Sequence, residues 1–380
     1  MKNNIRNIYP GGNTTKGFHS YYNFILPQNK AEKIIYLKGG PGVGKSTMMK
    51  KIGAYFEGKN ESIDYMWCSS DPDSLDGVLL KDRNVAVIDG TAPHIIDPIN
   101  PAAVDEILDL GRYWNREEIR KNRRQIIEIT EKTGGFFDNA YGYLKIAGVE
   151  YEFLWEMLAD TIDKKELSAL KWQFDSKVNA MTPIRRAENK VKHDIIVGNK
   201  INRGKESSFF AGAITPMGVR NSTLSLVKSL QKVIVLETPV GFKSQLFLEP
   251  AAARFQEAGY DVEKYYCPTD PERKIEHVII PEIKMGIITN NPFHNLHLSP
   301  KGKKVETVKV NVPPGKGVNS EIINQLIGSI RDNIDFAVKY LHMAKECHDE
   351  LEKYYSSNMD HEKIDEITEE IIEKVDNMLL

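Results

Sequence analysis

The sequence lacks the features of a secreted or membrane protein. Its 380 residues include only 3 cysteines, an odd number spread far apart, so we expect reduced thiols and no disulfide framework. A run of about 18 apolar residues, the length of a transmembrane helix, is missing. The first residues also lack the apolar core of a signal peptide. We therefore predict a cytoplasmic protein that has no membrane partner.

Charge of one sign is also missing. The formal net charge is −2 at pH 7, which gives no overall attraction to nucleic acid, and no nucleic-acid partner is expected. Neither a Cys-x-x-Cys pair nor a histidine cluster predicts a zinc site. Apolar and charged residues occur in ordinary proportions for a folded chain. The length predicts about two or three domains, each able to bury its own core.

The strongest motif is a glycine-rich stretch at residues 39–47. It follows apolar residues 34–37, precedes a helix-forming stretch at residues 48–56, and has the G-x-x-x-x-G-K-[ST] spacing of a Walker A phosphate loop. Glycines let backbone N–H groups converge on a phosphate, and the helix N-terminus adds partial positive charge. We expect Lys45 to reach the β- and γ-phosphates of ATP and the Ser46 hydroxyl to ligate Mg²⁺. The predicted nucleotide-binding residues are Gly39, Gly40, Pro41, Gly42, Val43, Gly44, Lys45, Ser46 and Thr47.

A second motif supplies a metal-binding carboxylate and raises the question of catalysis. The apolar residues 85–88 end at Asp89, the pattern of a Walker B strand, so Asp89 is predicted to hold Mg²⁺ together with Ser46. Many ATPases place a Glu next, but here the residue is Gly90. Asp71 and Asp73, just past the second predicted strand, are candidates for orienting the attacking water, with Asp76 as a weaker third choice. His94 and Thr91 could sense the γ-phosphate. Turn formation by Asp-Pro and a structural histidine are the competing interpretations.

The chain contains an internal repeat with an offset of about 200 residues. Residues 65–72 (YMWCSSDP) match residues 264–271 (KYYCPTDP), and Lys45-Ser46 matches Lys243-Ser244. Residues 87–94 likewise match residues 287–294. These matches occur in the same order along the chain, so we predict a tandem duplication with domains at 1–200 and 201–380, joined by a polar linker at residues 198–205.

Each copy has the same pattern of predicted elements. Short apolar runs separated by helical patterns predict an α/β domain with a mainly parallel sheet, followed by a helical extension. Residues 104–110 are predicted to be helical, and a strand-like run at residues 305–312 is expected in the second copy alone. The predicted strands lie at residues 7–9, 34–37, 63–68 and 84–88 of copy one and at residues 208–211, 233–236, 262–267 and 284–288 of copy two. The further predicted helices lie at residues 116–131, 140–162, 321–354 and 361–380.

The second copy lacks the residues of a Walker site. Gly39 corresponds to Glu237 and Gly44 to Phe242, so a carboxylate and a bulky side chain replace two glycines. Asp89 corresponds to Thr289. We therefore expect one nucleotide site in the chain, and a structural or regulatory second copy.

Three strings together resemble a known family: residues 37–47 (LKGGPGVGKST), 68–77 (CSSDPDSLDG) and 89–94 (DGTAPH). They are similar to those of a bacterial family of duplicated P-loop ATPases, seen mainly in spore-forming Gram-positive lineages and loosely labelled ATPase or nucleotide kinase. The resemblance covers nearly the whole chain. It implies two P-loop NTPase-like domains and ATP binding at residues 39–47. In the second half this chain departs from the phosphate loop that members of the family can keep.

These observations predict a Mg²⁺-dependent ATP-binding protein that acts as an ATPase through Lys45, Asp89 and Asp71. One alternative is a nucleotide or small-molecule kinase that transfers the γ-phosphate to a second substrate. Another is a nucleotide-gated scaffold with little turnover, which the Gly after Asp89 favours. An unknown protein partner or second substrate is expected in any of these cases. The repeat also gives the hypothesis that the two copies form an intramolecular pseudo-dimer, in which copy two completes or regulates the site of copy one.

Overall fold

The computed structural model divides into two compact units. It describes residues 4–93, 96–159, 162–182, 203–296, 302–311 and 319–378. Unit 1 comprises Met1–Ala147, Phe210–Ser225 and Arg331–Leu380, and unit 2 comprises Gly148–Phe209 and Leu226–Ile330. Within the described part of the chain, no helix combines the length and the apolar character that a bilayer span requires.

Unit 1 contains a mixed six-stranded sheet in the order β1-β5-β6-β7-β4-β8. Strand β4 pairs in parallel with β7 and β8, and β1 pairs in parallel with β5. Strand β6 runs antiparallel to both of its neighbours. The strands are β1 (Ile5–Ile8), β4 (Lys33–Lys38), β5 (Ile63–Trp67), β6 (Leu75–Leu80), β7 (Val85–Asp89) and β8 (Asp105–Asp109).

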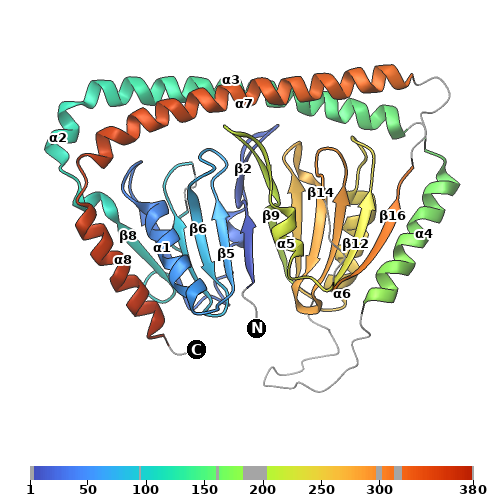
Figure 1. Ribbon diagram of the computed structural model, residues 1–380, viewed down its shortest axis with the longest axis horizontal. Coiled ribbons are helices and arrows are strands. Elements are labelled where there is room, and N and C mark those ends of the chain that lie inside the picture. Colours follow the sequence, from blue (N-terminus) through green and yellow to red (C-terminus); the bar gives the residue numbers. More distant parts are fainter. Residues whose placement is uncertain are drawn as a thin grey trace. The chain divides into compact units, whose positions relative to one another are not determined.

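Two helices far apart in the sequence, α1 (Lys45–Gly58) and α8 (His361–Asp376), join one core with the unit 1 sheet (Figure 1). Apolar residues of α8 such as Ile364, Ile367 and Ile371 are buried in the same cluster as Ile35 and Met49. Burial of several such side chains, at about 1.5–3 kcal/mol each, makes α8 an integral part of this unit. The remaining helices with residues in unit 1 are η1 (Tyr22–Phe24), η2 (Leu110–Tyr113), α2 (Arg116–Lys121), α3 (Arg123–Ala159), α5 (Thr223–Val227) and α7 (Ser320–Ser356).

A second, four-stranded sheet in unit 1 combines hairpins from both sequence halves, in the order β11-β10-β2-β3. Ile214 of β10 pairs with Asn13 of β2, and the Asn13 amide donates to the carbonyl oxygen of Ile214 at 2.9 Å. Asn13 also accepts a hydrogen bond from the hydroxyl of Tyr141 on α3. The strands are β2 (Gly11–Thr14), β3 (Gly17–Ser20), β10 (Gly212–Thr215) and β11 (Gly218–Asn221).

Unit 2 contains the second six-stranded sheet, in the order β16-β12-β15-β14-β13-β9. Helix α6 (Gln245–Glu257) and helix α4 (Lys164–Met181) share one buried core with this sheet, in which Phe174 and Val178 of α4 pack with Phe247 of α6. The strands are β9 (Glu206–Phe210), β12 (Lys232–Glu237), β13 (Val262–Cys267), β14 (Asp270–Ile280), β15 (Met285–Asn290) and β16 (Lys304–Lys309), and the 3₁₀ helix η3 is Pro281–Ile283.

The two mixed sheets have the same architecture. When both sheets are read from the edge formed by β1 or β9, their strands correspond one to one and lie at the repeat offset in sequence. The corresponding strands are β1 and β9, β5 and β13, β6 and β14, β7 and β15, β4 and β12, and β8 and β16. This correspondence supports duplicated α/β domains. The covering helices, however, are exchanged between the halves: α4 follows the first sheet in the sequence and packs in unit 2, whereas α8 follows the second sheet and packs in unit 1. The predicted halves, 1–200 and 201–380, are therefore repeats of sequence, and each compact unit contains segments of both.

Several predicted elements differ from the structure. Residues 104–110 do not form a helix: β8 (Asp105–Asp109) continues the sheet beside β4, because its backbone pairs in parallel with that strand. Copy one therefore has the counterpart of β16 that we expected only in copy two. The antiparallel strands β6 and β14 were not predicted either. Two predicted helices, at residues 116–131 and 140–162, are instead the short α2 and the 37-residue α3. Most of the predicted linker at residues 198–205 lies outside the described residues.

Candidate functional site

The glycine-rich loop connects β4 to α1 at the edge of the sheet where the parallel strands β4, β7 and β8 all end. Gly42 and Gly44 have φ angles of 70° and 88°, in the left-handed region that favours glycine. Gly44 is the residue that caps α1, so the amides of the first helical turn are left without a side-chain partner from the cap. Free amides and the helix dipole at this position favour an anion.

Lys45, the first residue of α1, bends back over the loop. Its ammonium group donates to the carbonyl oxygens of Gly39 at 2.6 Å and Gly40 at 3.1 Å, and to the hydroxyl of Thr91 at 3.1 Å. It also forms an ion pair with Asp89, with 3.3 Å between Nζ and Oδ2. The structure therefore brings together the lysine and the carboxylate that the two sequence motifs identified.

The side chains of Asp89 and Ser46 are each held by a different backbone N–H group. Asp89 lies at the end of β7, where its Oδ1 accepts a hydrogen bond from the backbone N–H of Thr91 at 2.8 Å. The Ser46 hydroxyl accepts from the backbone N–H of Leu75 on β6 at 3.0 Å, which leaves its second lone pair and its proton for other partners. Both side chains line the same cavity.

The cavity beside the loop has a volume of about 730 Å³. It is lined by residues 40–47, by polar residues that follow β5 and β7, and by the aromatic residues Phe18, Phe137 and Tyr141. Part of α7 lines it as well, through Ala344, Lys345, His348, Leu351 and Glu352. Sequence reasoning missed these α7 residues, because nothing in a helix nearly 300 residues from the loop in sequence indicates where it packs.

Asp71 is held by a turn and by α7. Its Oδ2 accepts from the Ser74 hydroxyl at 2.6 Å, and its Oδ1 lies 3.5 Å from the ammonium group of Lys345. Burial lowers the pKa of Lys345, but hydrogen bonding to Asp349 and the charge of Asp71 outweigh this effect and raise the pKa above its ordinary value. Lys345 therefore remains a cation at the cavity wall. The predicted catalytic role of Asp71 stays a prediction.

Two buried groups near Asp76, a residue of the cavity wall, are kept neutral. Burial and the neighbouring Asp76 carboxylate raise the pKa of Tyr22 well above its ordinary value, and the Tyr22 hydroxyl donates to Asp76 at 2.5 Å. Burial and Asp76 likewise raise the pKa of the Cys68 thiol. A thiol with a raised pKa is a poor nucleophile, so Cys68 is a structural residue of this wall.

The residue after Asp89 has no room for a side chain. A Cβ at Gly90 would lie 3.1 Å from the Lys38 ammonium nitrogen, which donates to the Gly90 carbonyl oxygen at 2.6 Å. A glutamate in this position, as many ATPases have, would require Lys38 to move. His94, a candidate for sensing the γ-phosphate, lies outside the described residues.

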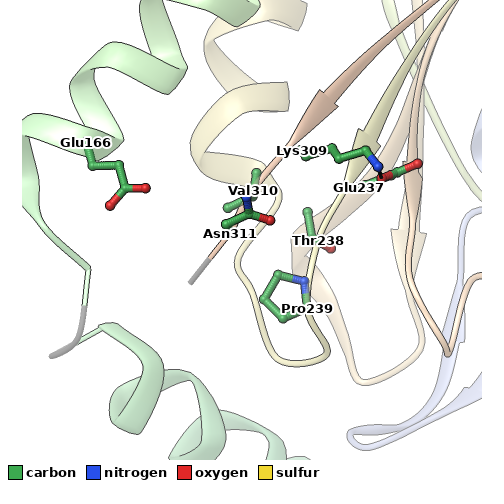
Figure 2. A pocket seen from close by; sticks show the side chains of 7 residues that line it. All are labelled: Glu166, Glu237, Thr238, Pro239, Lys309, Val310 and Asn311. Atoms are coloured by element: carbon green, nitrogen blue, oxygen red, sulfur yellow. Dashed lines mark ion pairs between the residues drawn. The ribbon is translucent and has the colours of Figure 1, made fainter. Parts of the chain in front are cut away.

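The corresponding edge of unit 2 has a different construction (Figure 2). An open pocket of about 620 Å³ is lined there by Glu237, Thr238 and Pro239 at the end of β12, by Lys309, Val310 and Asn311 at the end of β16, and by Glu166 of α4. Glu237 forms an ion pair with Lys309 at 3.3 Å, which Figure 2 marks with a dashed line. Glu237 is the last residue of β12 and has the position that Lys38 has at the end of β4, so the predicted correspondence of Glu237 with Gly39 is wrong by one residue.

Two further residues of this loop serve unit 2 in other ways. Phe242, the counterpart of Gly44, is buried in the unit 2 core. Lys243, the counterpart of Lys45, forms an ion pair with Glu152 at 2.5 Å and lies over the ring of Trp155. Since the lysine points to Glu152 and the phenylalanine fills the core, the features that mark the unit 1 loop are absent from this described stretch.

Comparison of the chain with family models, with curated proteins and with solved structures gives no match. The class that the structure itself defines is a duplicated, mixed α/β protein with long helices. The resemblance to duplicated P-loop ATPases stays a prediction.

Proposed function

We propose that unit 1 is a P-loop NTPase-like domain that binds ATP with Mg²⁺ at residues 39–47 and hydrolyses it. The observation that carries this proposal is the convergence of Lys45 and Asp89, 3.3 Å apart, at the N-terminus of α1 inside a cavity of about 730 Å³. A cation, a carboxylate and an amide-rich helix N-terminus are the groups that hold a triphosphate and its metal.

The residues present fit this ligand. Gly42 and Gly44 are left-handed and have no β-carbon at their own positions, so the loop amides there can approach phosphate oxygens. Lys45 would exchange the loop carbonyls for the β- and γ-phosphates, and Ser46 and Asp89 would hold the metal. Mg²⁺, when bound, would neutralise negative charge that develops on the phosphates. The aromatic residues Phe18, Phe137 and Tyr141 would offer flat apolar surface to a base.

The group that orients water is assigned to the carboxylates that line the cavity. Asp71 is bound by Ser74 and Lys345, and Asp76 accepts from Tyr22, so each is already engaged. Glu352 of α7 packs against the loop, because a Cβ placed on Gly42 would meet its Cγ at 2.8 Å. We assign the water-orienting role to Asp71 or Glu352. If Glu352 has this role, hydrolysis depends on a residue from the second half of the chain.

The experiment is an analysis of the products formed from ATP and Mg²⁺ by the full chain, compared with Asp89→Ala. Release of phosphate by the unmodified protein that falls at least about tenfold in the variant supports hydrolysis with Asp89 at the metal. Binding of ATP without turnover indicates the scaffold alternative, and phosphate transfer that exceeds phosphate release in the presence of an acceptor indicates a kinase. Failure to bind ATP with or without Mg²⁺ contradicts the proposal.

The choice between the two carboxylates is tested in the same assay. Asp71→Asn and Glu352→Gln both keep the size of the side chain and remove its charge. The variant of the water-orienting residue is expected to lower turnover by roughly 10²–10⁴-fold with little change in ATP affinity. Unchanged turnover in both variants would contradict the assignment.

A further inference from the structure

A cluster of metal-ligating side chains lies in unit 2, apart from the loop of unit 1. Cys267 is the last residue of β13, Glu276 lies on β14, and His294 follows β15. Strand β14 is antiparallel to both neighbours, so its first half lies beside the ends of β13 and β15, where the three side chains meet. The motif repeat had drawn attention to Cys267 and His294, but Glu276 joins them only through the sheet.

The distances from His294 to the other two ligand atoms match the edges of a tetrahedral metal site. His294 Nε2 lies 3.4 Å from Cys267 Sγ and 3.4 Å from Glu276 Oε1, and all three atoms lie within 4.8 Å of one another. Zinc bond lengths of about 2.3 Å to sulfur and about 2.0–2.1 Å to nitrogen and oxygen imply edges of roughly 3.4–3.6 Å in a tetrahedron. One ring nitrogen faces both partners, whereas a catalytic triad uses the two ring nitrogens separately. The arrangement therefore suits a shared cation better than a proton relay.

The site has an unsatisfied acceptor that a cation would satisfy. Glu276 is 1% exposed, and its Oε2 has no hydrogen-bond partner among the described residues. A buried carboxylate oxygen without a partner costs free energy, and coordination of a metal ion removes that cost. The His294 side chain is 16% exposed, which gives an ion and a fourth, solvent ligand a route to the cluster.

Lys274 supplies a positive charge to the cluster. Its ammonium group contacts Glu276 Oε1, lies 3.8 Å from Cys267 Sγ and donates to the Tyr151 hydroxyl at 2.7 Å. A metal ion at the centre of the cluster would repel this ammonium, which can keep its hydrogen bond to Tyr151 while leaving the carboxylate. The Lys274 ammonium group therefore competes with a metal ion for the Glu276 carboxylate.

We propose that Cys267, Glu276 and His294 form a binding site for one divalent ion of the zinc class. One sulfur, one nitrogen and one carboxylate oxygen are ligands that zinc accepts, and they leave a fourth position for water. The positions that correspond to two of the ligands in unit 1 are Cys68 and Asp76, and Asp76 is bound by Tyr22 there. The site is therefore a property of unit 2 and does not depend on nucleotide binding in unit 1.

The first experiment is a titration of the chelator-treated full chain with Co²⁺, followed by displacement with Zn²⁺. One equivalent of Co²⁺ is expected to give a thiolate-to-metal absorption band, which Zn²⁺ removes. Cys267→Ser is expected to abolish the band, whereas the matched control Cys347→Ser, at another buried cysteine, keeps it. A full chain that binds no Co²⁺ or Zn²⁺ would overturn the proposal, and so would a band that persists in Cys267→Ser.

The second experiment changes Lys274, which competes with the ion but is not a ligand, and compares it with a change of the ligand Glu276. Lys274→Met keeps the length of the side chain and removes its charge, so it is expected to raise the affinity for Zn²⁺ by roughly tenfold or more. Glu276→Gln is expected to lower the affinity by a similar factor. Circular dichroism of each metal-free variant checks that it folds. An unchanged affinity in both folded variants would show that the ion binds elsewhere and would contradict the site.

Discussion

Lys45 and Lys243 occupy equivalent positions in the two halves of the sequence but contact different groups. Lys45 lies over the glycine-rich loop and pairs with Asp89, whereas Lys243 pairs with Glu152 and lies over Trp155. A phosphate loop depends on the direction in which its lysine points, as well as on the presence of the lysine. The two residues therefore form a matched pair for mutation.

We predict that Lys45→Ala weakens ATP binding by roughly tenfold or more, because a hydrogen bond to a charged group contributes about 1.5–3 kcal/mol. Lys243→Ala is expected to leave ATP affinity unchanged and to alter stability by at most about 1 kcal/mol, since its ion pair is partly exposed to solvent. Calorimetric titration of the full chain with ATP measures both. Equal losses of affinity in the two variants would argue against a single site.

A buried ion pair between β1 and β5 makes the stability of unit 1 sensitive to acid. Arg6 donates to Asp64 through two nitrogens, at 2.7 Å and 2.5 Å, and both side chains are almost fully buried. Burial alone raises the pKa of Asp64, but the charges of Arg6 and Lys81 outweigh burial and hold the pKa below its ordinary value. The folded state therefore favours the ionised carboxylate.

Because the folded pKa of Asp64 is depressed, the stability that this pair contributes is present above the unfolded pKa of about 3.9 and is lost as pH falls through the folded value. We predict a steep loss of stability below about pH 4, measured as the urea midpoint against pH. Asp64→Asn should lower the midpoint at pH 7, at a cost of roughly 3–5 kcal/mol, and should flatten the acid limb. The exposed Asp365→Asn is the control, and an acid limb in Asp64→Asn as steep as in that control would contradict this assignment.

Local sequence predicted the unit 1 loop at the level of single residues. Lys45, Asp89 and residues 40–47 were named from two short motifs, and the structure places them around one cavity. Lys345, His348 and Glu352 could not be predicted, because a helix carries no local signal of the cavity that its side chains reach. Glu276 was not predicted, and Asp76 was only a weak candidate. The positions of both side chains depend on the antiparallel pairing of β6 with β5 and of β14 with β13.

Helix α8 is the element on which the unit 1 core depends most plainly. Its apolar residues pack with α1 and the sheet, and Lys59, the residue that follows α1, forms an ion pair with Asp376 at 2.6 Å. Figure 1 shows α8 beside α1, although more than 300 residues separate the two helices in sequence. The same role in unit 2 belongs to α4, which carries Phe174 and Val178.

We predict that Ile371→Ala, on the buried face of α8, lowers the free energy of unfolding by about 2–5 kcal/mol, through lost burial and the cavity that remains. The side chain is 7% exposed. Ile322→Ala, at an exposed position of α7, is the control and should change stability by no more than about 0.5 kcal/mol. Thermal and urea unfolding followed by circular dichroism provide the values. An effect of Ile371→Ala as small as that of the control would mean that α8 is dispensable.

The elements that sequence reasoning assigned wrongly have a common physical cause. β8 has three acidic residues in five, so its strand character comes from pairing with β4 and from the hydrogen bonds that Gln28 and backbone groups donate to Asp105. β6 contains an Asp and a Gly, and its pairing with β5 is interrupted by a bulge. In both strands tertiary pairing overrides local propensity. Helices α7 and α8 and the β4–α1 connection, in contrast, have periodicity of their own and were predicted.

At the scale of the whole molecule, the exchange of helices means that neither sequence half contains a complete unit. A fragment of residues 1–200 would have the unit 1 sheet without α8 and without the part of α7 that lines the cavity. We predict that this fragment alone unfolds without a cooperative transition and does not bind ATP. Co-expression with residues 201–380 should restore both properties.

Size-exclusion chromatography, circular dichroism and ATP binding of the fragment, alone and with its complement, test this prediction. The full chain is the reference for the unfolding transition. A fragment of residues 1–200 that melts cooperatively and binds ATP as well as the full chain does would show that the first half is self-sufficient. That result would also remove the hypothesis that the second copy completes the first.

The sequence distance between α1 and α8 also sets an order for biosynthesis. The glycine-rich loop and α1 leave the ribosome well before α7 and α8, which complete the same core and line the cavity. At about 5–20 residues per second, the first sheet waits on the order of 15 to 60 seconds for α8. Throughout that interval the apolar surface that α8 covers is exposed, and the nascent chain is a natural client for chaperones that bind exposed hydrophobic segments. Premature termination anywhere before α8 would leave a polypeptide that quality control can recognise by that same surface.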